Sequence, residues 1–452
     1  MVAAPAAPCQ TRCAALAPPA ACSSIARTAE PLASDVRILF VTGRFPYPLL
    51  RGDQLRAFHQ LRLLGPRHRI TLVAFGEEGR AEDGEREALA PYCDRIVRVP
   101  LGRAAMGRNL LRHGLSALPL QAALYDDPAM AQALRRLAAD GEHDVAHVQL
   151  ARMAPHLASC PARARVVDLV DALSMGMERR AARDRPPGRW LARLEAGRLR
   201  AYESRVCAEA DEAVVSSAAD RDALGAPPNV TVVPNGVDLE HFSFGRARRE
   251  PGRVVFTGNL GYFANADAVL WFATRVLPLL RRSLPGARFE VVGARPPRAL
   301  RRLARGDGAV DLVGPVADVG ARLRSAQAAV APLQAGSGQS NKILEAMASG
   351  TPVVATPLAT AGVEARHGEH LLVAATPEAF AGELVRLLGD AALAERLARA
   401  GRALVESAYT WERSVERLEA VYERALQKAP RTPRTNGNEK GRPDPDPSAP
   451  VS

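Results

Sequence analysis

The sequence predicts an α/β protein built of two Rossmann-like, doubly wound domains that face a central cleft. Its 452 residues suffice for two or three domains with their own cores. Hydrophobic residues make up 47% of the chain and aromatic residues 5%, which favours helices packed on aliphatic strands over an all-β barrel. Strand-like and helix-like segments alternate from residue 36 on, and the alternation begins again after a Pro-Asn-Gly turn at 234–236.

The first predicted domain covers residues 35–238. It opens with "VRILFVTG" at 36–43, an apolar run typical of a buried parallel strand. A loop and a helix with apolar residues at helical spacing follow, and then the strand "RITLVAF" at 69–75. The loop therefore lies at the carboxyl end of a strand, where such folds bind ligands. Further strands are predicted at 95–100, 144–150, 164–171 and 211–217.

The second predicted domain covers residues 239–408. "RVVFTGNL" at 253–260 is its first strand, and a long helix is predicted over 266–284. Further strands are predicted at 288–294, 310–316 and 328–334. A last helix, within 409–428, ends the ordered part. Residues 1–34 and 429–452 are rich in proline or charge, and we expect a disordered extension and tail there.

The chain carries a formal net charge of +11, which permits a sugar nucleotide, an acidic lipid surface or nucleic acid as partner. Between Arg179 and Arg205 nine arginines face three acids. This segment is either a solvated helix face or a membrane contact through Trp190, Leu191 and Leu194. No aromatic platform or reader motif indicates nucleic-acid binding, and no apolar run reaches the ~18 residues of a membrane span.

The six cysteines form no CxxC pair and no zinc pattern, so we expect reduced thiols in a cytoplasmic protein. We also expect no metal site. The Asp-x-Asp pattern at 444–446 lies in the predicted tail and is discounted.

The segment "GSGQSNKILEAMASGTPVVAT", residues 336–356, predicts a phosphate site. Gly336 and Gly338 allow backbone amides to approach a ligand closely. Ser340 and Asn341 are expected to cap a helix whose N-terminus attracts an anion. Lys342 adds a formal positive charge at the same end.

Lys342 and Glu345 lie three residues apart, on neighbouring positions of one helix face. Elsewhere this spacing is most often an exposed ion pair worth a few tenths of a kcal/mol. Directly after a glycine loop it favours ligand binding, because a carboxylate beside a phosphate site can accept the hydroxyls of a ribose.

"NKILEAMASGTPVVAT", "VVPNGVDLEHF" and "VVFTGNL" resemble the donor domain of family 4 glycosyltransferases, which have the two-domain GT-B fold. "FPYPLLRGDQLRAFHQLRLL" and "FTGNLGYFANADAVLWFATRVLPLL" resemble the sugar transferases of exosortase/PEP-CTERM systems within that family. The resemblance covers about residues 36 to 427. It implies transfer of a hexose, with retention of configuration, from a nucleotide-diphosphate sugar to a glycan or lipid-linked hydroxyl in exopolysaccharide or cell-surface glycan synthesis.

The resemblance also implies the donor site. In the family, two glutamates separated by seven residues hold the sugar and the ribose; Glu345 matches the second, whereas Ser337 stands at the first. Asn259 and Asn265 stand where an arginine and a lysine commonly hold the diphosphate, so Lys342 becomes the expected basic group. The donor-side set is Gly258, Asn259, Gly336, Ser337, Gly338, Ser340, Asn341, Lys342 and Glu345.

On the acceptor and sugar side, the resemblance places Gly52 and Asp53 in the glycine loop after the first strand. A family histidine at the end of a later strand is replaced by Asp171, with Asp168 and Ser174 nearby; these aspartates could instead cap the next helix. His147 also ends a strand, and a structural role fits it equally. The predicted catalytic residues are Asp171, Lys342 and Glu345.

The resemblance implies no cofactor beside the donor, and a cytoplasmic protein peripheral on the inner face of the membrane. Two alternatives stay open: a nucleotide-sugar 2-epimerase, and an inactive relative that binds nucleotide or membrane.

Overall fold

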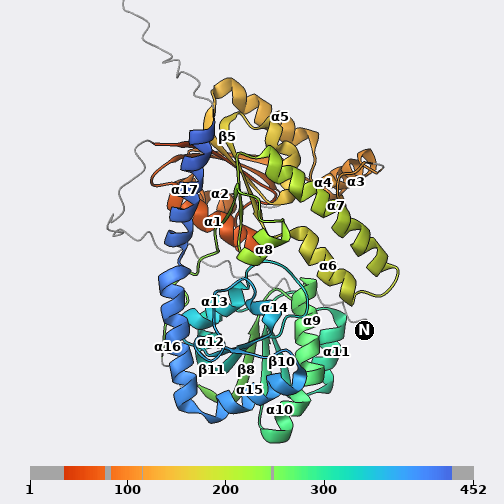
Figure 1. Cartoon of the computed structure of the whole chain (residues 1–452), viewed down its shortest axis with the longest axis vertical. Helices are drawn as coiled ribbons and strands as arrows, with labels where there is room; N and C mark the ends of the chain where they lie inside the picture. Colours follow the sequence, from red (N-terminus) through yellow and green to blue (C-terminus); the bar gives the residue numbers. More distant parts are fainter. Residues whose placement is uncertain (1–34, 77–82, 115, 246–248, 430–452) are drawn as a thin grey trace, which may run out of the picture.

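The computed structural model describes residues 35–76, 83–114, 116–245 and 249–429. It consists of two α/β domains stacked along the long axis, each with a parallel sheet covered by helices on both faces (Figure 1). Most of the predicted extension and tail, 1–34 and 430–452, lies outside the described residues.

The N-terminal domain is built on a seven-stranded parallel sheet with strand order β3-β2-β1-β4-β5-β6-β7. The order reverses between β1 and β4, which is the switch point where doubly wound sheets bind ligands. The strands are β1 Arg37–Thr42, β2 Arg69–Gly76, β3 Arg95–Pro100, β4 His143–Gln149, β5 Ala162–Val170, β6 Glu212–Val215 and β7 Val230–Val232. The helices are α1 Gly52–Leu64, α2 Asp83–Glu87, η1 Ala90–Tyr92, α3 Arg103–Arg112, α4 Leu120–Ala123, α5 Pro128–Leu137, η2 Ala138–Asp140, η3 Ala151–Ser159, α6 Leu173–Arg183, α7 Gly188–Glu209 and α8 Ala218–Ala223.

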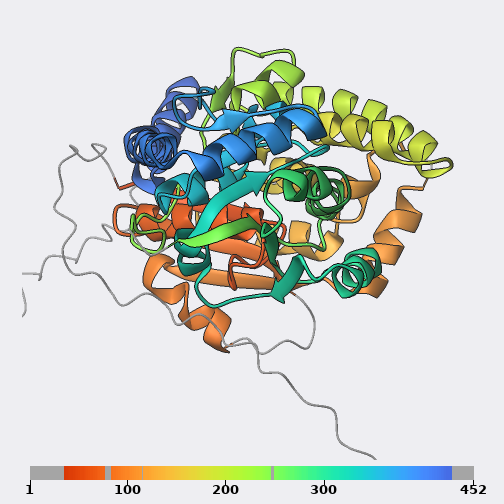
Figure 2. The same ribbon diagram turned by 90° about the horizontal axis from the view of Figure 1, so that it is seen from below.

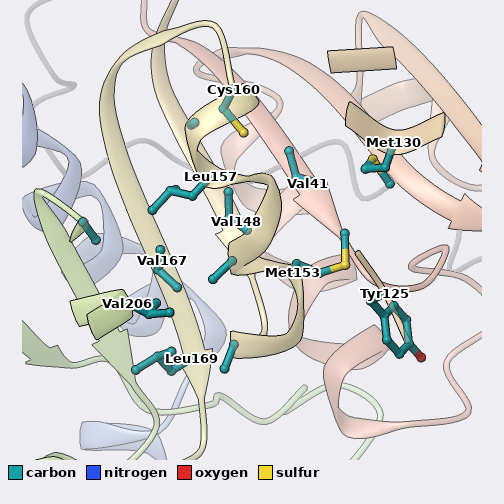
Figure 3. Packing of buried hydrophobic residues seen from close by; sticks show 14 of the residues in the cluster. Val41, Tyr125, Met130, Val148, Met153, Leu157, Cys160, Val167, Leu169 and Val206 are labelled. Atoms are coloured by element: carbon teal, nitrogen blue, oxygen red, sulfur yellow. The ribbon is translucent and has the colours of Figure 1, made fainter. Parts of the chain in front are cut away.

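Alternation along β1 shows why this sheet is covered on both faces. Ile38 and Phe40 belong to the hydrophobic cluster with α1 and the C-terminal helix. Leu39 and Val41 belong to the other cluster, in which Val148 and Val167 meet Met153 and Tyr125 (Figure 3). Because successive strand residues point to opposite faces, a continuous apolar run fills two cores.

The C-terminal domain has a six-stranded parallel sheet with strand order β10-β9-β8-β11-β12-β13 and its switch point between β8 and β11. Its strands are β8 Glu250–Thr257, β9 Arg288–Val292, β10 Val310–Gly314, β11 Ala326–Ala331, β12 Val353–Ala355 and β13 Leu372–Val373. The helices are α9 Phe263–Trp271, η4 Phe272–Val276, α10 Leu277–Ser283, α11 Arg298–Gly306, α12 Val319–Ser325, α13 Asn341–Ala348, α14 Pro357–Thr360, α15 Pro377–Gly389, α16 Ala391–Ala408 and α17 Trp411–Lys428.

The stretch α9–η4–α10, Phe263–Ser283, is long and apolar enough to cross a membrane by length and composition, and it is the one such helix in the described residues. The expectation that no segment reaches that threshold is therefore wrong. Half of the stretch is buried inside the protein. Val269, Phe272 and Val276 are fully buried in the domain core, as in a core helix of an α/β domain.

The C-terminal helix α17 lies on the N-terminal domain, beside α1 (Figure 1). The Trp411 ring stacks on His59 at 4.6 Å between centroids. At the far end Lys428 Nζ lies 2.6 Å from the Glu212 carboxylate. The chain therefore crosses between the domains twice, and both switch points face the same interface. Figure 2, viewed from below, shows the two domains in projection over one another.

Candidate functional site

The glycine loop follows β11 and precedes α13, at the carboxyl edge of the second sheet. Gly336 and Gly338 have φ of 118° and 78°, which L side chains rarely adopt. A Cβ on Gly338 would stand 1.9 Å from Oδ1 of Asp171 in the other domain. Glycine is thus required here by conformation and by close approach, and the loop meets the end of β5.

The backbone amides of this loop already hold polar groups of the N-terminal domain. The N–H of Gly338 donates a hydrogen bond to the Asp220 carboxylate. The N–H of Gln339 donates to Ser216 Oγ at 3.3 Å. The sequence predicts an anionic ligand at the amides of this loop. In the structure the Asp220 carboxylate occupies part of that place.

Asp171 is turned toward the cleft by a strained residue. Val170 has φ of 65°, which is unusual for a β-branched side chain, and such strain concentrates at functional sites. Ser216 Oγ donates to Asp171 Oδ1 at 3.2 Å. Burial and the neighbouring Asp220 carboxylate raise the pKa of Asp171 to about 7. Its proton is therefore exchanged near neutral pH.

Lys342 and Glu345 form no ion pair with each other or with any other group in the part of the chain that the structure describes. Both side chains are half-buried. Burial lowers the pKa of Lys342 to about 8 and raises the pKa of Glu345 to about 7, each partly offset by the other. The ammonium lies 5.5 Å from the centroid of Phe256, two residues before Gly258. An unpaired lysine and an unpaired carboxylate at this edge are available to a ligand.

The other residues of the α13 start have different roles. Ser340 is the N-cap residue but makes no side-chain capping bond, so that expectation is wrong; its buried Oγ has no hydrogen-bond partner among the residues that the structure describes. Asn341 Oδ1 accepts a hydrogen bond from Asn235 Nδ2 at 3.1 Å. Ser337 lies against α6, with Oγ 2.9 Å from the position of a Cβ on Gly176.

The turn after β8 is held by its own amide groups. Asn259 Oδ1 accepts from the N–H of Gly261, and the Asn259 carbonyl accepts from Asn265 Nδ2, both at 2.9 Å. A Cβ on Gly258 would meet the Asn265 amide at 2.9 Å. The Asn265 side chain closes this turn, and Gly258 and Asn259 form the turn itself.

Comparison with known proteins assigns the two domains. Residues 55–241 match the family model described as Glycosyltransferase Family 4, and residues 251–390 match the model described as Glycosyl transferases group 1. The chain belongs to the family 4 glycosyltransferases. The matched ranges correspond to the N-terminal and C-terminal domains of this family 4 chain.

Two relatives show how far the likeness reaches. D-inositol 3-phosphate glycosyltransferase of Geodermatophilus obscurus is 35% identical over 255 residues, 50% of this chain and 55% of the relative. Phosphatidyl-myo-inositol mannosyltransferase of Mycobacterium leprae is 28% identical over 311 residues, 67% of this chain and 79% of the relative. The match thus spans little more than half of the first relative.

Solved structures show the fold. Sucrose-phosphate synthase from Thermosynechococcus elongatus has a TM-score of 0.66 at 16% identity, covering 86% of this chain and 99% of that one. Anabaena HepE in complex with UDP and glucose has a TM-score of 0.60 at 14% identity, covering 86% and 99%. The fold of this family 4 chain is GT-B, with two Rossmann-like domains.

Two predicted sugar-side residues of the family 4 chain are buried away from the cleft. The Asp168 carboxylate is fully buried and lies 2.7 Å from Arg56 Nε. His147 is also fully buried: its ring stacks on Phe40 at 4.3 Å, and Nδ1 lies 2.9 Å from the Tyr422 hydroxyl. Burial lowers the pKa of His147 to about 4, which keeps the ring neutral. The placement of both at the sugar is wrong, because they form the core between β4, β5 and α17.

Ser174 is likewise buried, with Oγ 2.5 Å from the Glu203 carboxylate of α7. It joins α6 to α7 and does not face the cleft, so its predicted ligand role is wrong. Gly52 and Asp53 begin α1. Asp53 is paired with Arg44, and a Cβ on Gly52 would meet no atom within 4 Å. Asp53 is therefore a fixed counter-ion at the β1 switch point beside open space.

The structure adds residues that sequence reasoning missed. Ser216 and Asp220 follow β6, and polar residues directly after "EAVV" were the available signal. From α6, Arg179 Nη1 donates to the Gly336 carbonyl at 2.7 Å, and Arg183 Nη2 lies 2.8 Å from Asp267. Both arginines belong to the arginine-rich segment noted in the sequence, but the sequence does not show that α6 contacts the donor domain.

Within residues 35–429, as far as they are described, no group of three or more His, Cys, Asp or Glu side chains could hold a metal ion.

Proposed function

We propose that the protein transfers a hexose from a nucleotide-diphosphate sugar to a hydroxyl of a glycan or lipid-linked acceptor, with retention of configuration. One observation carries this proposal: the glycine loop, the α13 start and the unpaired Lys342 and Glu345 open at the carboxyl edge of the donor-domain sheet, opposite Asp171. Membership of family 4, and the UDP and glucose named for a protein of this fold, support it.

The donor side supplies positive potential for the leaving group. The α13 N-terminus carries the positive end of the helix dipole, and the loop amides of Gly338 and Gln339 can donate to phosphate oxygens. Lys342 adds a formal charge that stabilises the diphosphate as the sugar–phosphate bond breaks. Glu345 then accepts hydrogen bonds from the ribose hydroxyls.

Asp171 meets the sugar from the opposite wall. A carboxyl group with a pKa of about 7 is protonated or ionised at neutral pH with nearly equal ease, which suits contact with hexose or acceptor hydroxyls during the reaction. Retention follows if the acceptor hydroxyl attacks from the face that the diphosphate leaves, with a phosphate oxygen taking its proton.

Donor entry requires the domains to part. Asp220 and Ser216 occupy the loop amides that the diphosphate would use. Binding of the diphosphate displaces the carboxylate from the amides, and reclosure around the sugar excludes water.

The acceptor belongs to exopolysaccharide or cell-surface glycan synthesis, and the enzyme works as a peripheral protein on the cytoplasmic face of the membrane. The name of the Mycobacterium leprae relative, a phosphatidyl-myo-inositol mannosyltransferase, supports a lipid-linked acceptor.

The test is a mass-spectrometric screen of nucleotide-sugar donors with the purified protein, comparing wild type with Glu345→Ala and Lys342→Ala. We expect turnover of at least one donor and its loss in both variants. Nuclear magnetic resonance of the product reports the anomeric configuration, and an inverted product contradicts retention. Full activity of both variants contradicts this donor site.

The same screen separates two other outcomes. A 2-epimerase releases free nucleotide and an epimerised sugar without acceptor. An inactive relative binds nucleotide in calorimetry but turns over no donor.

A further inference from the structure

Helix α7 presents an exposed apolar surface far from the donor site. Trp190, Leu191 and Leu194 are 64%, 57% and 58% exposed, an unusual degree for side chains of this size. They lie at the start of α7, next to the turn that joins it to α6. Figures 1 and 2 both show this helical hairpin projecting from the body of the molecule.

The exposed apolar residues line one stripe of the helix. Trp190, Leu194, Gly197 and Ala201 follow at spacings of four, three and four, so they stack along one face. The opposite face is buried through residues such as Leu199. The stripe therefore faces outward from a helix that is firmly packed on its other side.

Arginines flank the stripe, and no exposed acid balances them along it. By helical spacing Arg193 lies on one edge, and Arg198 and Arg205 lie on the other. None of the three forms an ion pair in the part of the chain that the structure describes. Glu195 and Glu203 are buried, at 3% and 0% exposure, and so lend no negative charge to the outer surface.

The stripe is also the floor of a groove. This groove, of about 500 Å³, runs between α7 and the segment that precedes α4. Leu194, Gly197 and Ala201 line it together with Ala117 and the arginines 193, 198 and 205. An apolar floor rimmed by guanidinium groups complements acyl chains below phosphate headgroups.

We propose that this α7 surface docks the protein on an anionic lipid bilayer. Trp190, Leu191 and Leu194 enter the interface, and the three arginines contact lipid phosphates. This proposal rests on the peripheral membrane location proposed above and names the surface that makes the contact; the contact itself needs neither nucleotide nor turnover.

The hairpin connects this contact to the cleft. Helix α6 has 11 residues, about 16 Å at 1.5 Å per residue, and it runs from the Asp171 edge to the hairpin turn. Arg179 and Arg183 hold α6 against the donor domain. A bilayer at the turn therefore lies about one helix length from the site where a lipid-linked hydroxyl reacts.

The first experiment measures cosedimentation of the full chain with phosphatidylcholine vesicles, with and without phosphatidylglycerol. We expect binding only to the anionic vesicles. Since each basic residue at such a surface contributes a factor of about five, the triple variant Arg193→Gln/Arg198→Gln/Arg205→Gln loses roughly 100-fold in partitioning. Leu194→Ser should lose about tenfold.

The matched control makes the same charge change on the other side of the molecule. Arg396, Arg413 and Arg417 are exposed on α16 and α17, across the body from α7 (Figure 1). The variant Arg396→Gln/Arg413→Gln/Arg417→Gln should keep wild-type binding. An equal loss in both triple variants shows that binding follows net charge alone, and overturns the proposal.

The second experiment locates the contact. Trp411 is buried, Trp271 is half-buried, and Trp190 is exposed, so Trp190 reports insertion. We expect a blue shift of tryptophan emission on anionic vesicles that disappears in Trp190→Phe while binding persists. Unchanged emission of bound wild type, or self-association through this surface in sedimentation velocity without lipid, overturns the proposal.

Discussion

The two walls of the cleft hold their charged residues in different ways. On the donor wall, Lys342 and Glu345 are half-buried and unpaired. On the N-terminal wall, Asp168 is sealed in the core against Arg56, and only Asp171, three residues later, reaches the cleft.

The difference shows that the role of a charged residue at the end of a strand depends on which residue, if any, pairs with it. Arg56 comes from α1, 112 residues before Asp168, and forms a fully buried ion pair with it. Asp171 is not enclosed in this way, because Val170 turns the chain and a register shift ends the regular pairing of β5 with β6. Asp168 stabilises the core, whereas Asp171 lies against the glycine loop, where we propose that it contacts the sugar.

Breaking the buried pair has the largest expected effect. Asp168→Ala leaves the Arg56 guanidinium buried without its counter-ion, which costs about 3–5 kcal/mol of unfolding free energy. Asp171→Ala, the matched variant on the cleft side, should change stability by less than about 1 kcal/mol, because burial already disfavours its ionised form. Urea unfolding followed by circular dichroism measures both. Equal losses would erase the distinction between the two aspartates.

Asp171→Asn tests the proposed role of Asp171 in the transfer reaction. We expect kcat to fall roughly 100-fold, the scale of removing a positioned acid or base, with unfolding free energy unchanged. Nucleotide affinity should not weaken, because the proposed site places Asp171 at the sugar and not at the nucleotide. Steady-state kinetics and calorimetry with UDP measure the two quantities. A parallel loss of nucleotide affinity assigns Asp171 to donor binding instead.

Gly338→Ala tests the contact between the two walls. A Cβ would stand 1.9 Å from Asp171 Oδ1 at a φ of 78°, so the loop and β5 must separate. We expect about a tenfold loss of activity, for 1–2 kcal/mol of left-handed strain and lost closure, and a larger radius of gyration in small-angle scattering. Gly382→Ala, on the exposed side of α15, is the control, since nothing lies within 4 Å of its added Cβ. An unchanged radius of gyration contradicts closure through this contact.

The sequence predicts the fold well because its evidence is local. Apolar runs such as 36–43 and the glycine loop before "NKILEAMA" carry their structure in neighbouring residues, and both sheets formed where expected. The unpaired state of Lys342 and Glu345 was favoured by the same local context.

The N-terminal wall could not be predicted in this way. Whether Asp168, His147 or Ser174 faces the cleft depends on Arg56, Tyr422 and Glu203, which lie far away in sequence. No periodicity encodes those pairs. The stacking of the domains, which brings Ser216 and Asp220 to the loop amides, is also a tertiary property.

The smallest expected effect is the pH dependence of nucleotide binding at the donor wall. Glu345, with a pKa of about 7, gains its charge as pH rises through 7, and Lys342, with a pKa of about 8, loses its charge as pH rises through 8. In the proposed donor site, ribose binding needs the Glu345 carboxylate and diphosphate binding needs the Lys342 ammonium. UDP affinity measured by calorimetry should therefore be greatest between these values and fall about fivefold on either side. Protonation of the nucleotide itself also weakens binding at low pH, so the variants decide the matter. Glu345→Gln should flatten the acidic limb relative to wild type, and Lys342→Gln should remove the alkaline one. If both variants keep the wild-type pH dependence of UDP affinity on both sides of the maximum, neither residue contacts the nucleotide. Lys342 and Glu345 would then have only a structural role, as Asp168 does.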